Sequence, residues 1–307
     1  MSDDIILHHY DTSPFSEKVR ILLGIKGLTW RSVIQPTIMP KPDLTPLTGG
    51  YRRIPVMQIG ADVFCDSQVI MAEIERRAPQ PRAIHGGDWA VNLFADRLMF
   101  QPVVAIIFGA IGHTVPAEFI KDREAMSGGR PFDVAGMNAA AEPMKGQFRA
   151  MAAWVERQLA GGAPWIAGET PGLADIAWYM NFWFFRSALK VEMSALIQDM
   201  PGVQDWRVRV AALGHGSPSG MTSAEAIAAA LAARPAATDH IVHDPRDPMG
   251  LAPGAAVHVM ADDYGRDAIA GSLVAANLDR IVIAREHPRV GAVNVHFPRV
   301  GFSAAPV

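Results

Sequence analysis

The sequence predicts a multidomain protein that combines an α/β domain, an all-helical domain and a small antiparallel β domain. Strand and helix patterns alternate up to residue 80, apolar residues follow helical spacing over 88–213, and short β-branched runs follow residue 254. A chain of 307 residues also exceeds the usual size of a single core. We therefore expect domains at 1–80, 88–213 and 254–307, with 214–253 as a connecting arm.

The first 80 residues have the element order of an α/β domain. The expected strands are Ile5–His9, Trp30–Ile34, Val56–Ile59 and Val63–Cys65, and the expected helices are Pro14–Lys26 and Ser67–Arg77. Gly60, Ala61 and Asp62 separate the last two strands, which predicts a hairpin between them.

The rest of the chain changes from helical to strand-like patterns. The expected helices of the second domain are Trp89–Gly112, Glu142–Leu159, Leu173–Leu189, Met193–Ile197 and Val203–Val210. In the arm, one alanine-rich helix is expected over Ser223–Arg234, with Ser223 as its N-cap. The expected C-terminal strands are Val257–Ala261, Ala268–Val274, Arg280–Ala284 and Ala292–Phe297.

The composition excludes several classes of function. A net charge of −3 without a basic run gives no reason to expect nucleic acid or an anionic membrane as a partner. The apolar stretch Val103–Gly112 is too short to span a bilayer, and the acidic N-terminus does not resemble a secretory signal, so a cytoplasmic protein is expected. The single cysteine, Cys65, excludes a Cys-x-x-Cys redox pair and a cysteine-rich metal site, and we predict no metal.

The turn before the first helix is the most informative segment. In Tyr10-Asp11-Thr12-Ser13-Pro14-Phe15-Ser16, a strand passes through a hydroxyl-rich turn into a helix that begins with proline, which places Ser13 at the N-cap. Ser13 either only caps the helix or also donates a hydrogen bond to a thiolate bound at the positive helix end. The second possibility needs a thiol from a ligand.

The segment from Ser13 to Arg20 resembles the active-site turn of serine-type glutathione transferases. The resemblance implies a thioredoxin-like N-terminal domain that binds glutathione, followed by the helical domain of that family. It assigns the contact with the glutathione sulfur to Ser13 first, to Ser16 second and to Thr12 third. It also implies a homodimer in which the two domains pack across subunits.

Two further segments carry the same resemblance. Arg53-Ile54-Pro55-Val56 resembles the segment in which a cis-proline presents backbone to the cysteinyl unit of glutathione, with Val56 as the pairing residue. Arg52 and Arg53 are candidates for the glycine carboxylate or the carbonyl groups of glutathione, and Lys41 is a weaker candidate.

Asp66 and Ser67 begin the last helix of the domain. An acidic side chain and a helix N-terminus can hold the ammonium and carboxylate of a γ-glutamyl group. The family more often has a longer acidic or amide residue before this serine. Neighbouring Cys65 ends a strand and is expected to be an apolar core residue.

The helical domain carries a structural signature and an aromatic cluster. Gly168 to Ala177 resembles a folding signature of the family, in which Asp175 caps a helix and Gly172 replaces the usual hydroxyl residue. The aromatic residues that flank an apolar co-substrate in the family, or that only form core, are Phe100, Phe108, Trp178, Tyr179, Phe182, Trp183 and Phe185, with Arg186 beside them.

These features favour an enzyme that binds glutathione as co-substrate and activates its thiol for attack on a small apolar electrophile. The alternative is a noncatalytic member of the fold that binds partners through the groove or through the C-terminal strands, because fold alone does not fix function. Reduction or dehalogenation through an enzyme cysteine is disfavoured, since the turn contains serine where that chemistry needs a thiol.

Overall fold

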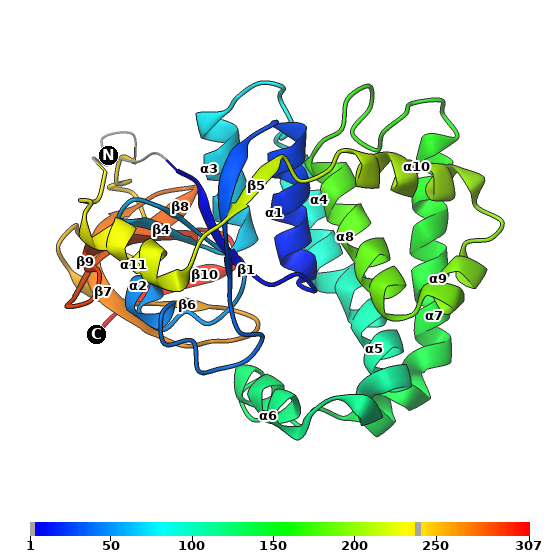
Figure 1. Ribbon diagram of the computed structural model, residues 1–307, viewed down its shortest axis with the longest axis horizontal. Helices are drawn as coiled ribbons and strands as arrows, with labels where there is room; N and C mark the ends of the chain where they lie inside the picture. The colour runs from blue at the N-terminus through cyan, green and yellow to red at the C-terminus, as the bar shows by residue number, and fades with distance from the viewer. Residues whose placement is uncertain (1–3, 237–240) are drawn as a thin grey trace.

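A computed structural model describes residues 4–236 and 241–307. Residues 1–3, which belong to the expected first domain and its N-terminal segment, and residues 237–240 of the expected arm lie outside the described part. Figure 1 shows strands gathered on one side of the molecule and the helices α4, α5 and α7 to α10 on the other. Helix α6 lies at the foot of the helical part and reaches toward the strands.

The N-terminal part has the predicted order of elements. Its strands are β1 (Ile6–His9), β2 (Thr29–Ile34), β3 (Val56–Ile59) and β4 (Asp62–Cys65), and its helices are α1 (Pro14–Ile25), the short α2 (Thr45–Thr48) and α3 (Ser67–Arg77). Strand β1 pairs parallel with β2 and antiparallel with β3, and β3 forms the expected hairpin with β4. This is the thioredoxin-like arrangement.

The middle of the chain is helical between residues 88 and 212. The elements are α4 (Asp88–Phe94), a π-helical turn (Ala95–Met99), α5 (Phe100–Ile111), a 3₁₀ turn (Gly112–Thr114), α6 (Ala117–Met126), α7 (Val134–Leu159), α8 (Leu173–Ala188), α9 (Lys190–Leu196) and α10 (Pro201–Ala212). Helix α6 was not predicted, and α7 begins at Val134 instead of Glu142. Pro143 lies inside α7, one residue after the predicted start of this helix.

The helical run Asp88–Thr114 is long and apolar enough to span a membrane by length and composition alone. In this structure it packs as a core helix, because Met99, Val103, Ile106 and Ile107 are almost fully buried in one cluster with residues of α7 and α8. The apolar stretch Val103–Gly112 therefore belongs to a helix of the helical core.

The arm after residue 213 returns the chain to the first sheet. Strand β5 (Ser217–Gly220) pairs parallel with β2, and α11 (Ser223–Leu231) follows it. The N-cap of α11 is Thr222, one residue before the predicted Ser223, because Thr222 and Glu225 form a reciprocal capping box. Strand β5 was not predicted, since Ser-Pro-Ser-Gly has no strand-like composition.

The C-terminal strands continue the N-terminal sheet. They are β6 (Ala256–Ala261), β7 (Ile269–Ala276), β8 (Arg280–His287), β9 (Gly291–Pro298) and β10 (Phe302–Pro306), each antiparallel to its neighbours within this group. Strand β9 pairs parallel with β4, with Val63 opposite Val295, so the sheet has ten strands in the order β10-β6-β7-β8-β9-β4-β3-β1-β2-β5. The predicted antiparallel strands are present, but they are not a separate sheet.

Two large apolar clusters hold the chain together. One joins α1, α3 and the face of β1 and β3 to the helices α5, α7, α8 and α10. The other lies on the opposite face and joins Leu47, Tyr51 and Val63 to the C-terminal strands, with Phe297 and Phe302 against Tyr51. The C-terminal strands therefore share a core with the N-terminal sheet.

Candidate glutathione site

One cavity of about 1240 Å³ lies where the sheet, the helices and the C-terminal strands meet. The turn before α1, the segment before β3 and the start of α3 line one side, and residues of α5, α6 and α7 line the other. Asp263 and Tyr264 from the loop between β6 and β7 complete the wall, together with Gly301 and Phe302. Three segments predicted from the sequence thus share one cavity.

The turn before α1 places its hydroxyl groups at different depths. Thr12 is exposed and lines the cavity. Ser13 has the predicted N-cap role: it is 1 % exposed, its Oγ accepts a hydrogen bond from the Ser16 amide at 3.1 Å, and it does not line the cavity. Ser16 is fully buried, and its Oγ has no hydrogen-bond partner among the described residues. The structure brings Thr12 to the cavity and places Ser13 and Ser16 behind it.

Tyr10 is a cavity residue that the sequence reasoning did not select. Tyr10 directly follows the last residue of β1, and it lines the cavity together with Thr12. Burial raises the pKa of its hydroxyl, while the charge of Arg123 and a hydrogen bond with Ser13 oppose that rise. A tyrosine next to a strand end has no sequence signal that separates a ligand contact from packing.

The Ile54–Pro55 peptide is cis, as predicted, and both residues line the cavity. Val56 is fully buried inside the sheet, where it lies opposite His8 of β1 and Cys65 of β4. Strands therefore flank Val56 on both sides. Val56, the predicted pairing residue, does not line the cavity, whereas Ile54, two positions earlier, does.

Asp66 and Ser67 stand at the start of α3, and both line the cavity. Asp66 is the N-cap, and its Oδ1 accepts a hydrogen bond from the Gln68 amide at 2.9 Å. Its φ of 94° lies in a region that costs a non-glycine residue about 1–3 kcal/mol. Burial raises the pKa of this carboxyl group, and the Gln68 amide and Arg53 oppose the rise.

Basic side chains gather at the edge of the cavity near α6. Arg52 and Arg123 both pair with Asp122 of α6, and Arg53 pairs with Asp263 at 2.5 Å. Lys41 also lines the cavity and is 4 % exposed, and its ammonium group has no hydrogen bond or ion pair with any described residue. Burial lowers the pKa of its ammonium group to about 8, against the opposing charge of Asp122.

The other side of the cavity is apolar. Phe100 and Phe108 line it as predicted, whereas Trp178, Tyr179, Phe182 and Phe185 belong to the buried core of the helical part. Trp183 packs near the guanidinium of Arg20, and neither Trp183 nor Arg186 lines the cavity. The aromatic residues that complete the apolar wall, and that the sequence did not indicate, are Phe15, Phe119, Phe132 and Phe184.

Asp175 is a buried structural residue. Its carboxylate accepts hydrogen bonds from the amides of Ile166, Ala167 and Gly172 and from the indole of Trp206, at 2.7–3.2 Å. Gly172 has no side chain that could accept a hydrogen bond from the Asp175 amide. Only the bond from the Gly172 amide to the Asp175 carboxylate therefore forms in the predicted capping box. Burial raises the pKa of the Asp175 carboxyl group, and the four donors oppose that rise.

Cys65, the single cysteine of the sequence, does not line the cavity. Cys65 is fully buried, and burial raises the pKa of its thiol well above the usual value. In the ranges 4–236 and 241–307, no group of three or more histidine, cysteine, aspartate and glutamate residues is arranged to hold a metal ion.

The fold and the cavity define the class of a glutathione-transferase-like protein, and comparison with known proteins agrees. Residues 7–82 match the family model of the glutathione S-transferase N-terminal domain, and residues 138–209 match that of the C-terminal domain. A GST-like protein from Pseudomonas syringae is 35 % identical, with a TM-score of 0.80 over 98 % of this chain and 100 % of that one. The chain belongs to the glutathione S-transferase family.

More distant structures share the fold. A Tau class glutathione S-transferase from mango is 17 % identical, with a TM-score of 0.53 over 69 % of this chain and 90 % of that one. A glutathione S-transferase from Rhodospirillum rubrum is 18 % identical, with a TM-score of 0.52 over 67 % and 87 %. A family member from Pseudomonas fluorescens, solved with two glutathione bound, is 17 % identical, with a TM-score of 0.51 over 67 % and 88 %. Comparison with curated protein sequences finds no match.

Proposed function

We propose that this protein binds glutathione and activates its thiol for attack on a small apolar electrophile. The observation that carries the proposal is the shared cavity, in which the N-terminal turn of α1, the Ile54–Pro55 segment and the start of α3 face an aromatic wall. The glutathione reported with the Pseudomonas fluorescens family member supports the choice of ligand.

The tripeptide takes an extended path along the sheet side of the cavity. The γ-glutamyl group lies at Asp66, Ser67 and the N-terminus of α3, where amide groups and the helix dipole favour a carboxylate. The cysteinyl unit pairs with the backbone at Ile54, beside Pro55. The glycine carboxylate binds Lys41, whose buried ammonium lacks a partner within the described part of the chain.

The thiol lies at the N-terminal turn of α1. Lowering a thiol pKa by about two units requires about 2.7 kcal/mol. The helix dipole supplies about 0.3–1 kcal/mol, and a hydrogen bond to a charged group supplies about 1.5–3 kcal/mol. A hydroxyl group must therefore provide most of the effect. Thr12 is the hydroxyl of this turn that lines the cavity, while the resemblance assigns the role to Ser13.

The electrophile occupies the aromatic side of the cavity. Phe15, Phe100 and Phe184 form a contiguous surface there, since the rings of Phe15 and Phe100 lie 5.1 Å apart and those of Phe100 and Phe184 lie 5.8 Å apart. This surface favours an apolar molecule, because burial of apolar area is the main source of its affinity.

We also propose that the protein acts as a cytoplasmic homodimer. The outer edge of β4 is occupied by β9 of the same chain, so two copies must associate through other surfaces. Leu98 and Trp154, which are 61 % and 49 % exposed in the helical part, are candidates for such a surface. Light scattering after size-exclusion chromatography tests the dimer, and a monomeric mass would contradict it.

The proposed activity is tested by calorimetric titration of glutathione, with the ultraviolet absorbance of the bound thiolate followed against pH. Binding with a thiol pKa below that of free glutathione is the expected result. Binding without a change in thiol pKa would support the noncatalytic alternative, and no binding would overturn the proposal.

A further inference from the structure

The loop between β6 and β7 is held against the cavity by the helical part. The amide of Gly265 donates a hydrogen bond to the carbonyl of Met126 at 2.7 Å, and the Tyr264 hydroxyl donates to the carbonyl of Arg123 at 3.4 Å. Gly265 has a φ of +57°, and a Cβ there would lie 3.2 Å from Nε of Arg53. The C-terminal strands thus deliver this loop to the cavity in a fixed position.

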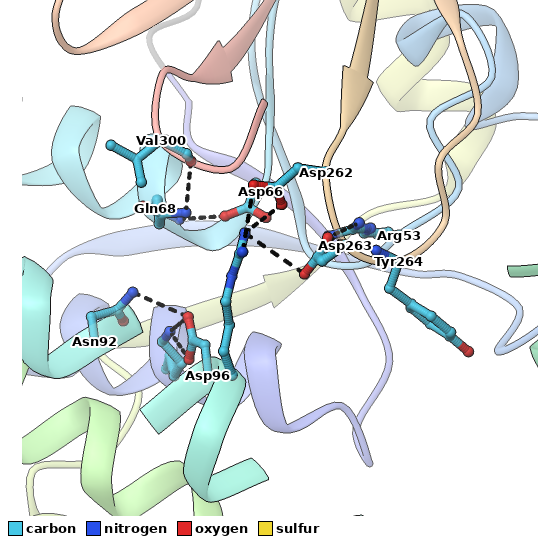
Figure 2. Close-up of polar contacts among 11 residues, drawn as sticks. Arg53, Asp66, Gln68, Asn92, Asp96, Asp262, Asp263, Tyr264 and Val300 are labelled. Atoms are coloured by element: carbon cyan, nitrogen blue, oxygen red, sulfur yellow. Dashed lines mark hydrogen bonds and ion pairs between the residues drawn. The ribbon is translucent and has the colours of Figure 1, made fainter. Parts of the chain in front are cut away.

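The loop brings two carboxylates to the start of α3. Asp263 pairs with Arg53 at 2.5 Å, and Asp262 pairs with Arg97 at 2.6 Å. Figure 2 shows both aspartates beside Asp66, with Arg53 next to Asp263. Asp262 and Asp263 therefore share two guanidinium groups, and no Lys or Arg nitrogen in the described residues lies within 4.0 Å of Asp66. Of the two loop aspartates, Asp263 lines the cavity.

This charge arrangement matches the amino-acid end of a γ-glutamyl group, which carries an ammonium and a carboxylate on one carbon. The amides at the start of α3 suit the carboxylate, and the ammonium then needs an anionic neighbour. We propose that Asp263, together with Asp66, binds the α-ammonium group of a γ-glutamyl ligand. The proposal rests on the function proposed above, and it makes the C-terminal strands part of the ligand site.

The ion pair with Arg53 has a defined role in this arrangement. It directs the Asp263 carboxylate toward the segment before Ile54. Without the C-terminal strands, the start of α3 would offer Asp66 as the carboxylate nearest to the ammonium. Asp263 therefore determines whether the site distinguishes a ligand that carries the ammonium from one that lacks it.

Calorimetric titration with glutathione and with glutaryl-cysteinyl-glycine, which lacks only the α-amino group, tests this proposal. We expect the wild type to bind glutathione about ten- to hundredfold more tightly, the range of one charge-assisted hydrogen bond. Asp263→Asn should weaken glutathione binding alone and bring the two affinities close together. Asp267→Asn, an exposed change in the same loop outside the cavity, should leave the preference intact.

Each other outcome overturns the proposal in a distinct way. A wild type that binds both ligands equally, or an Asp263→Asn variant that keeps the preference, leaves the proposed function standing and removes the role of Asp263. Equal weakening of both ligands assigns Asp263 to loop structure alone. Failure of the wild type to bind either ligand overturns the proposed function together with this inference.

Discussion

Glu73 in α3 and Arg280 in β8 lie 3.3 Å apart, which joins the last helix of the thioredoxin-like part to the C-terminal strands. The Glu73 side chain is 1 % exposed and also pairs with Arg76 and Arg77. Despite burial, which acts in the opposite direction, these arginines lower the pKa of Glu73 to about 2. The appended strands are therefore anchored by charge as well as by apolar packing.

This cluster predicts an acid-dependent contribution to stability. Because the folded pKa of Glu73 lies below its unfolded value of 4.5, the contribution is complete at neutral pH and is lost as the pH falls from about 5 to about 2. Glu73→Gln should lower the free energy of unfolding by about 3 kcal/mol at pH 7. Urea titrations at pH 7, 5 and 3 measure the difference between wild type and variant.

That difference should shrink between pH 5 and pH 3 because wild-type Glu73 becomes protonated in the unfolded state. Glu192→Gln, an exposed change in α9, is the control and should alter stability little at any pH. A gap between wild type and Glu73→Gln that stays constant down to pH 3 would contradict the proposed electrostatic anchor.

We expect the affinity for glutathione to depend on pH because of the Lys41 ammonium group. This group titrates near pH 8 in the free protein, so it holds a carboxylate below this pH and loses that ability above it. We expect Lys41→Met to weaken binding of S-methylglutathione about tenfold or more at pH 6.5. At pH 9 the gap between wild type and Lys41→Met should narrow.

S-methylglutathione removes the thiol titration from this measurement, and Lys41→Arg keeps the charge without titrating in this range. The affinity of Lys41→Arg should therefore fall less than that of the wild type between pH 6.5 and pH 9. Identical pH profiles for wild type and Lys41→Met would show that the glycine carboxylate binds elsewhere.

We expect the two hydroxyl groups before α1 to have different roles, with Thr12 contacting the ligand and Ser13 capping the helix. Thr12→Val removes the hydroxyl that lines the cavity, and it should raise the pKa of the bound thiol by about one unit or more. Ser13→Ala removes the bond to the Ser16 amide and should cost about 1 kcal/mol of folding free energy. Thiolate absorbance and urea unfolding of both variants distinguish the two roles.

If Ser13→Ala raises the thiol pKa and Thr12→Val does not, Ser13 contacts the sulfur as the resemblance implies. Ser16→Ala is the matched control, since the Ser16 hydroxyl is buried and lacks a partner among the described residues. It should leave the thiol pKa unchanged.

The sequence could predict what local patterns determine. Helix α3 has the predicted bounds, Ser13 caps α1 as the Ser-Pro step indicates, and the family resemblance rests on these short segments. The hairpin of β3 and β4 also follows from the turn residues that begin at Gly60, although Asp62 belongs to β4. Each of these features depends on residues a few positions apart.

Long-range contacts determine what the sequence could not show. The pairing of Val63 with Val295 joins strands more than 200 positions apart, and neither strand pattern specifies its partner. Asp263 lies in an Asp-Asp-Tyr-Gly segment, which is typical of turns, and only the continuous sheet brings it to Arg53. The strands on both sides of Val56 are likewise long-range neighbours that its local sequence does not specify.

Among single substitutions in the helical part, we expect Asp175→Ala to cause the largest loss of stability. Three amides and the Trp206 indole donate to its carboxylate, and all four would lose a charged acceptor in Asp175→Ala. Buried donors left unpaired cost about 1–3 kcal/mol each, so we expect a loss of about 3 kcal/mol or more, measured by urea unfolding. Asp199→Asn, which breaks the exposed pair with Arg149, should change stability little. An Asp175→Ala variant as stable as Asp199→Asn would show that these donors find other acceptors, and Asp175 would then not organise the start of α8.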